Sequence, residues 1–180
     1  SKDVSQREVY IVEGDSALGS CKLARDPMFQ AIMPIRGKIL NCLKADYPRI
    51  FKSDIITDLV KVLGCGVEIK SAHNKNIESF NLDNLRWDKV IICTDADVDG
   101  SHIATLLMTF FFRYMREVVE GGHIYLAKPP LFLIKYSNNK REYVYNEEAL
   151  AEKLNSLVEE RRARGVEIIP TDPLPKQAGL

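Results

Sequence analysis

Two short apolar runs, each followed directly by acidic residues, constrain the fold of this chain more than any other feature. Residues 9–12 precede Glu13, and residues 89–93 precede Thr94 and Asp95. Short apolar runs bounded by turn residues are typical of buried β-strands. In an open α/β sheet, ligands bind outside the carboxyl ends of the strands. The pattern therefore predicts two strands that bring carboxylates together at one edge of a sheet.

The rest of the chain alternates between signals for helices and strands. A Gly or Pro follows most of the periodic segments, and Ser16, Ser53 or Asp54, and Asn146 are the expected N-caps. The apolar residues 31–35 lead to a basic turn, and residues 66–84 read as a loop or insertion. The order predicts an α/β fold with a mainly parallel sheet and an appended β-hairpin and helix. The expected strands are 9–12, 89–93 and 123–127, the hairpin is 131–136 with 142–145, and the helices are 16–25, 55–63, 100–120 and 147–164.

Length and composition limit the class of protein. The 180 residues are enough for one domain with an appendage, which we place at residues 1–136 and 137–180. The 25 basic and 25 acidic side chains give a formal net charge of zero, which excludes a uniformly basic surface for nucleic acid but allows a local basic face. Four widely spaced cysteines indicate reduced thiols, and no stretch is apolar enough to span a bilayer. We expect a cytoplasmic fragment of a longer protein.

The acidic residues predict a metal site. Glu13, Asp95, Asp97 and Asp99 repel one another when they are close, and a bound cation relieves that repulsion. Carboxylate oxygens suit Mg²⁺, which completes its coordination with water and phosphate oxygens, so a phosphate ester is the expected substrate. A solvated turn is the plain alternative for residues 95–100. A calcium loop of the EF-hand type is disfavoured because Leu106 stands where that loop needs a Glu.

A basic turn at residues 36–38 supplies cations near this edge. Gly37 lets another backbone approach closely, and Arg36 and Lys38 suit the phosphates of a polyanion; a solvated surface turn is the alternative. His102 stands at the start of the helix that follows the Asp cluster, where capping, packing and a phosphate contact are all open.

Four motifs in order resemble those of one known family, the TOPRIM domains of the B subunits of bacterial type IIA topoisomerases, which are DNA gyrase and topoisomerase IV. The resemblance covers residues 9–134 and leaves open which of the two enzymes is the parent. The motifs are Glu13-Gly14-Asp15-Ser16-Ala17, residues 29–41 (FQAIMPIRGKILN), residues 94–103 (TDADVDGSHI), and residues 122–125 (GHIY) with 129–132 (PPLF).

The resemblance implies a Rossmann-like TOPRIM fold and roles for particular residues. Glu13 is implied as the metal-binding general acid and base, Asp95 and Asp97 as further metal ligands, and Asp99 as an outer or alternative ligand. Lys38 and Asn41 are implied to contact DNA, with Arg36 and His102 nearby. Asp15 and Arg36 correspond to positions that flank the fluoroquinolone pocket.

The resemblance also implies cofactors and partners. Two Mg²⁺ ions are expected with DNA bound, and Mn²⁺ or Ca²⁺ is expected to substitute. The nucleophilic tyrosine would come from the A subunit in an A2B2 assembly that acts on double-stranded DNA. ATP would bind only in another domain of the parent protein, so the isolated fragment should be inactive.

Three departures from the family pattern keep the metal residues intact but leave open the subfamily and the details of DNA or drug contacts. Leu18 replaces a common Gly, Ala104 stands where many gyrases carry Arg, and residues 67–80 are longer than usual. Two alternatives are a stand-alone TOPRIM nuclease or primase-like enzyme, and a binding module whose acidic cluster is inert.

Overall fold

Four parallel strands form the sheet that carries the candidate site. The computed structural model describes residues 1–37, 39–68 and 79–165. The strand order is β2-β1-β3-β4, and all neighbouring strands are parallel. Because Glu13 pairs with Ile35 and Val12 pairs with Cys93, the carboxyl ends of β1, β2 and β3 lie level at one edge. The strands are β1 (Glu8–Glu13), β2 (Gln30–Ile35), β3 (Lys89–Cys93) and β4 (Ile124–Leu126).

The predicted α/β fold class is confirmed. In addition, the apolar run at residues 31–35 lies within a fourth strand of the sheet. The strands predicted at 9–12, 89–93 and 123–127 are β1, β3 and β4. The run at 31–35 becomes β2, which pairs with β1 on the outer side of the sheet. Pro34 has no N–H to donate, and an outer strand tolerates it because one side of such a strand is unpaired.

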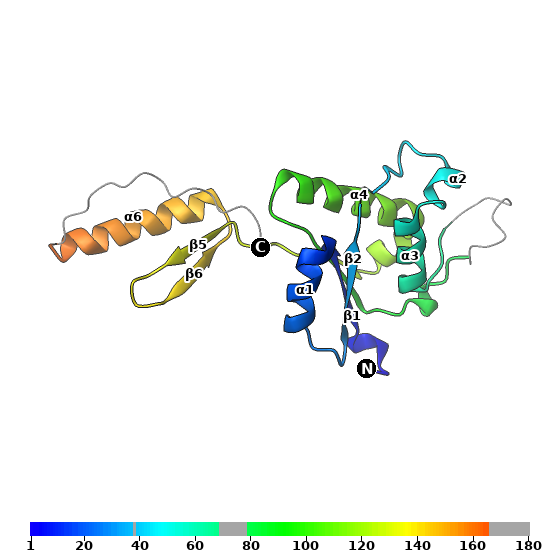
Figure 1. Cartoon of the computed structure of the whole chain (residues 1–180), viewed down its shortest axis with the longest axis horizontal. Helices are drawn as coiled ribbons and strands as arrows, with labels where there is room; N and C mark the ends of the chain where they lie inside the picture. The colour runs from blue at the N-terminus through cyan, green and yellow to red at the C-terminus, as the bar shows by residue number, and fades with distance from the viewer. Residues whose placement is uncertain (38, 69–78, 166–180) are drawn as a thin grey trace. The chain divides into compact units, whose positions relative to one another are not determined.

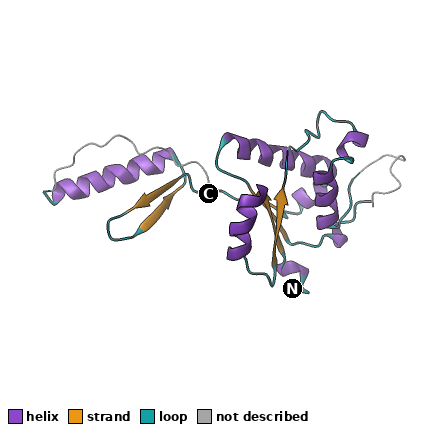
Figure 2. Ribbon diagram, in the orientation of Figure 1, coloured by secondary structure: helices purple, strands orange, loops and turns teal. Residues whose placement is uncertain are grey.

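Helices cover both faces of the sheet in the first of two compact units, which spans residues 1–127. In Figures 1 and 2, α1 lies on one side of the strands and α3 on the other. None of the helices in the described ranges is long and apolar enough to cross a membrane. The helices of this unit are α1 (Gly14–Ala24), α2 (Tyr47–Ile50), α3 (Asp54–Leu63), α4 (Val98–Tyr114) and α5 (Arg116–Glu120), with short 3₁₀ turns at Val4–Gln6 and Leu82–Asn84.

Two helix starts differ from the sequence predictions. Helix α1 begins at Gly14 with Glu13 at its N-cap, so Ser16 lies inside the helix and does not cap it. The helix expected from residue 100 to residue 120 begins earlier, at Val98, and breaks at Met115, whose φ of −143° and ψ of 51° are not helical. The early start arises because the Asp97 side chain accepts a hydrogen bond from the Gly100 N–H, which caps the helix.

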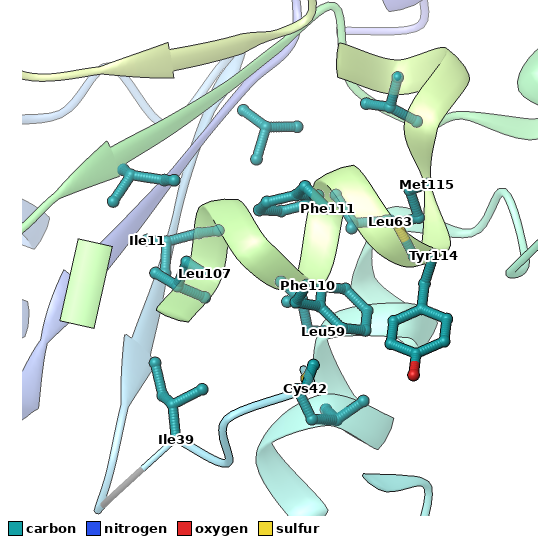
Figure 3. Packing of buried hydrophobic residues seen from close by; sticks show 14 of the residues in the cluster. Ile11, Ile39, Cys42, Leu59, Leu63, Leu107, Phe110, Phe111, Tyr114 and Met115 are labelled. Atoms are coloured by element: carbon teal, nitrogen blue, oxygen red, sulfur yellow. The ribbon is translucent and has the colours of Figure 1, made fainter. Parts of the chain in front are cut away.

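The core of this unit lies between the sheet and the helices α3, α4 and α5. Figure 3 shows Phe110, Phe111 and Tyr114 of α4 among the buried side chains, with Leu59 and Cys42 close by. The rings of Phe110 and Phe111 meet edge to face with centroids 5.6 Å apart, a favourable geometry for aromatic pairs. This packing fixes α4, and therefore the loop that leads from β3 into it.

The second compact unit begins at Lys128. The predicted hairpin and charged helix are confirmed as β5 (Phe132–Lys135), β6 (Arg141–Val144) and α6 (Glu147–Ala163). Asn146 caps α6 by accepting from the Ala149 N–H at 2.7 Å. The compact units divide between Ala127 and Lys128 because β5 pairs with β6 and not with the parallel sheet. The division at 136 and 137 into a TOPRIM domain and a tail stays a prediction.

Candidate functional site

The candidate site lies at the carboxyl edge of the parallel sheet, where three strands end. Glu13 is the last residue of β1, Arg36 directly follows β2, and Thr94 and Asp95 follow β3. The register pairs Glu13 with Ile35 and Val12 with Cys93, so these three strand ends are neighbours. This is the edge at which parallel α/β sheets bind ligands.

Glu13 has an unusual environment for a carboxylate. Its Oε2 atom is buried and has no hydrogen-bond partner among the residues that the structure describes. The backbone N–H of Asp95 donates to the Glu13 carboxylate, which by itself lowers the pKa. Burial, followed by the negative charges of Asp95, Asp97 and Asp99, outweighs that bond and raises the pKa of Glu13 above the ordinary glutamate value. An acceptor oxygen without a donor, held among like charges, favours either a proton or a cation.

The loop from Asp95 to Asp99 turns sharply instead of continuing the strand. The Gly100 N–H donates to Oδ1 of Asp97 at 2.7 Å. A Cβ atom at position 100 would lie 2.1 Å from the Asp95 carbonyl oxygen, so only glycine fits there. The structure thus places Asp97 at the helix cap and exposed Asp99 in the first turn of α4, while Asp95 stays next to Glu13.

The residues fit a magnesium ion in chemistry, without forming a complete set of ligands. Within the described part of the chain, no three Asp, Glu, His or Cys side chains are grouped closely enough to hold a metal ion. Mg²⁺ commonly uses only one or two carboxylates and takes its other ligands from water and phosphate. The unpartnered Oε2 of Glu13 and the neighbouring Asp95 match that requirement.

The structure describes three of the four side chains that the resemblance implies as DNA contacts, and each has a different environment. Arg36 pairs with Asp15 in the first turn of α1, with its Nη2 atom 2.8 Å from Oδ1. Lys38 lies outside the described residues. Oδ1 of Asn41 accepts from the Leu43 N–H at 3.0 Å, so this side chain supports its own turn. His102 is exposed near the start of α4, where solvent and ligands reach it.

Of the three departures from the family pattern, one points away from the site. Ala104 lies in α4, is 7% exposed and belongs to the buried core cluster, so its small side chain packs on the buried face of the helix. Leu18 is half-buried on α1. Most of the unusual segment at 67–80 lies outside the described residues, and Val67 and Ser79 form a single β-bridge at its base.

Sequence reasoning missed two features of the site. It did not identify Asp97 as the cap of α4, although an Asp three residues before Gly100 at the start of an apolar helix has cap spacing. It also did not foresee that Arg36 is paired with Asp15, because these residues lie 21 positions apart and only the β1–β2 register brings them together.

Comparisons with known proteins match the chain to one family model and to DNA gyrase B subunits. The family model described as Toprim domain matches residues 8–129. The chain is 54% identical over 154 residues to the DNA gyrase B subunit of Campylobacter jejuni, a match that covers 86% of this chain and 19% of that protein. It is 42% identical over all 180 residues to the DNA gyrase B subunit of Mycolicibacterium smegmatis, of which it covers 25%. The match to the DNA gyrase B subunit of Mycoplasmoides gallisepticum is 48% over 155 residues, or 86% of this chain and 22% of that protein.

These comparisons confirm the resemblance drawn from the motifs. The chain spans about a fifth to a quarter of the length of the curated relatives it matches. The matched region begins at the first residue of β1 and includes Glu13, Asp95, Asp97 and Asp99.

Proposed function

Because this chain belongs to the Toprim domain family, we propose that it supplies the metal-binding carboxylates and part of the DNA contacts of a type IIA topoisomerase of the gyrase kind. The reaction is cleavage and religation of double-stranded DNA. The observation that carries the proposal is the buried Oε2 of Glu13, which has no hydrogen-bond partner among the described residues and lies beside Asp95 at the sheet edge.

We assign the metal-holding role to the carboxylates at the ends of β1 and β3. Glu13 and Asp95 would hold one Mg²⁺, and Asp95 and Asp97 would hold a second when DNA supplies phosphate ligands. Asp97 uses Oδ1 to cap α4, which leaves Oδ2 for an ion, and Asp99 serves as an outer ligand. When bound, Mg²⁺ supplies positive charge that stabilises the phosphate oxygens during displacement.

Proton transfer is the second role proposed for Glu13. The partner A subunit supplies the tyrosine that attacks the phosphodiester, which leaves a free 3′ hydroxyl. Since the pKa of Glu13 is raised, this carboxyl accepts a proton more readily than an ordinary glutamate. It is therefore suited to donate a proton to the leaving 3′ oxygen and to take it back on religation.

The DNA contacts would come from the basic side of the same edge. Arg36 and His102 are exposed there, and Lys38 and Asn41 belong to the same family motif. ATP hydrolysis would occur elsewhere in the parent protein, which we propose acts in the cytoplasm as an A2B2 assembly.

A cleavage assay tests the metal role. In an assembly with the A subunit and the ATPase region, Glu13→Ala and Asp95→Ala should each reduce Mg²⁺-dependent DNA cleavage about 100-fold or more, the scale seen when a group that stabilises developing charge is lost. Glu117→Ala is the matched control because Glu117 is an exposed carboxylate on α5. Full cleavage by either site variant, with folding preserved, contradicts the proposal.

The chain alone distinguishes the alternative functions. We expect no nicking or primer synthesis with Mg²⁺, whereas a stand-alone nuclease or primase-like enzyme would show one of them. A Mg²⁺ titration followed through backbone amide signals near Asp95 should give saturable local shifts. An inert binding module would give none.

A further inference from the structure

An exposed ion pair joins the first turn of α1 to the end of β2. The Nε atom of Arg36 lies 2.9 Å from Oδ1 and 3.1 Å from Oδ2 of Asp15, and Nη2 lies 2.8 Å from Oδ1. The Asp15 carboxylate therefore occupies one whole edge of the guanidinium group. Both side chains are well exposed, at 66% and 64%.

The pair stands beside the candidate metal site. Asp15 lies two residues after Glu13, and Arg36 directly follows Ile35, which pairs with Glu13 in the sheet. Gly14 and Gly37, next to the two partners, have φ angles of 71° and 94°, a region that suits glycine. Apart from the chain neighbours of each glycine, no described atom lies within 4 Å of a Cβ built at either position.

A phosphodiester competes for the same atoms of Arg36. Guanidinium binds carboxylate and phosphate through the same pair of parallel N–H bonds. An exposed ion pair is weak because water screens both charges and both side chains lose conformational freedom. A phosphate arriving at this edge therefore displaces Asp15 at little cost.

We propose that Asp15 is a positioning residue that holds Arg36 against α1 in the absence of DNA, and that a DNA phosphate displaces the Asp15 carboxylate from the Nε and Nη2 edge. The identity of the ligand rests on the function proposed above. The consequence is that Asp15 opposes DNA binding through Arg36, although it lies at the binding edge.

Duplex binding by the 180-residue chain tests the proposal. Fluorescence anisotropy with a labelled duplex of about 20 base pairs is measured in EDTA at low salt, so that no metal site contributes. Asp15→Asn should tighten binding about threefold, the scale of one exposed ion pair. Arg36→Gln should weaken binding and lower the salt-dependence slope by about 0.9.

Two controls separate release of Arg36 from a general loss of negative charge. Asp58→Asn removes an equally exposed carboxylate that pairs with Lys61 at 3.7 Å on α3, and it should leave affinity unchanged. In the Arg36→Gln background, Asp15→Asn should also have no effect, because the cation it releases is gone. The Trp87 fluorescence spectrum checks that each variant is folded.

The Arg36 Nε–H resonance reports displacement directly. It should move on duplex addition in the wild-type chain, and in Asp15→Asn the resonance of the free chain should already differ from that of the free wild type. An Asp15→Asn variant that binds no tighter than Asp58→Asn, equal tightening in the Arg36→Gln background, or absence of duplex binding overturns the proposal. Because this binding assay contains EDTA, its result does not depend on metal binding. A failure of the metal role in the cleavage experiment is therefore distinguishable from a failure of this proposal.

Discussion

The two compact units of this chain differ in how they are stabilised. Residues 1–127 bury a large cluster of apolar side chains between the sheet and the helices α3, α4 and α5. In the described part of the second unit, Val144 is the one buried apolar side chain. That unit relies on hairpin pairing, the Asn146 cap and polar contacts of Glu142 with Tyr136 and Lys153.

The difference indicates which unit can hold a precise site. Apolar burial is the dominant stabilising contribution in folding, and a two-stranded hairpin with one helix buries little. The candidate site is built on strand ends fixed by the larger core. We therefore expect hydrogen exchange to be slow in α4 and much faster in α6.

The largest expected effect comes from removing a core aromatic ring of the first unit. Phe110→Ala should destabilise this unit by about 3–5 kcal/mol, because Phe110 is fully buried against Phe111 and Tyr114. The single tryptophan, Trp87, lies in this unit and reports its unfolding by denaturant. Phe112→Ala is the control, since that ring is 55% exposed and should cost less than about 1 kcal/mol. An equal loss in the free energy of unfolding for the two variants would contradict the position of Phe110 in the core.

A smaller loss of stability is expected when a larger side chain is introduced into the loop between β3 and α4. Gly100→Ala should destabilise the first unit by about 1–3 kcal/mol, because the new Cβ collides with the Asp95 carbonyl. Gly19→Ala is the matched control inside α1, where no described atom lies within 4 Å of the new Cβ. That change should stabilise the unit by about 0.5–1 kcal/mol. A tolerated Gly100→Ala contradicts the tight turn.

Removing the same kind of helix cap from each unit compares their stabilities. Asn146 caps α6 in the second unit, and Asp46 caps α2 in the first. Asn146→Ala and Asp46→Ala each remove a side-chain oxygen that accepts a backbone N–H, and each should cost about 1 kcal/mol. Hydrogen exchange measured by mass spectrometry should show faster exchange confined to α6 for Asn146→Ala. For Asp46→Ala the change should extend through the first unit because its core unfolds cooperatively. The same pattern in both variants would contradict separate stabilities.

The pH dependence of the second unit gives a further, smaller effect. Hydrogen bonds from Lys153 and then Tyr136 lower the pKa of Glu142. A carboxylate with a lowered pKa contributes stability above its unfolded pKa, and that contribution is lost as the pH falls through the folded pKa. Protection of α6 should therefore decrease below the ordinary glutamate range. Glu142→Gln should remove this dependence, and an unchanged acid profile in that variant would contradict the assignment.

The pH dependence of stability that arises from Glu13 should have the opposite sign to that from Glu142, and its size should be the smallest of these effects. Its raised pKa means that the folded state favours the protonated form, so its contribution is present at low pH and lost as the pH rises through the folded pKa. Glu13→Gln should therefore raise the melting temperature at neutral pH in EDTA and leave it unchanged below the unfolded glutamate pKa. Added Mg²⁺ should stabilise the wild type more than the variant. A lower melting temperature of Glu13→Gln than of the wild type at neutral pH in EDTA contradicts this environment of Glu13.

Local sequence patterns predicted the elements that depend on neighbouring residues. The strands β1 and β3, the helix α3, and the hairpin with Asn146-capped α6 all follow from spacing and cap residues. The predicted start of α4 is two residues late. The capping residue Asp97 lies close after β3, where its sequence reads as part of the loop that leaves the strand. The run at residues 31–35 is apolar, but its sequence does not say which strand it joins.

The sequence by itself determined that two acidic strand ends and a basic turn belong to a Toprim domain, since those residues are contiguous within each motif. The tertiary structure decided how they are used. It joined β2 to β1, left Oε2 of Glu13 buried without a partner among the described residues, and paired Arg36 with Asp15. These features depend on strand register and burial, which join residues about 20 to 80 positions apart and have no local signal.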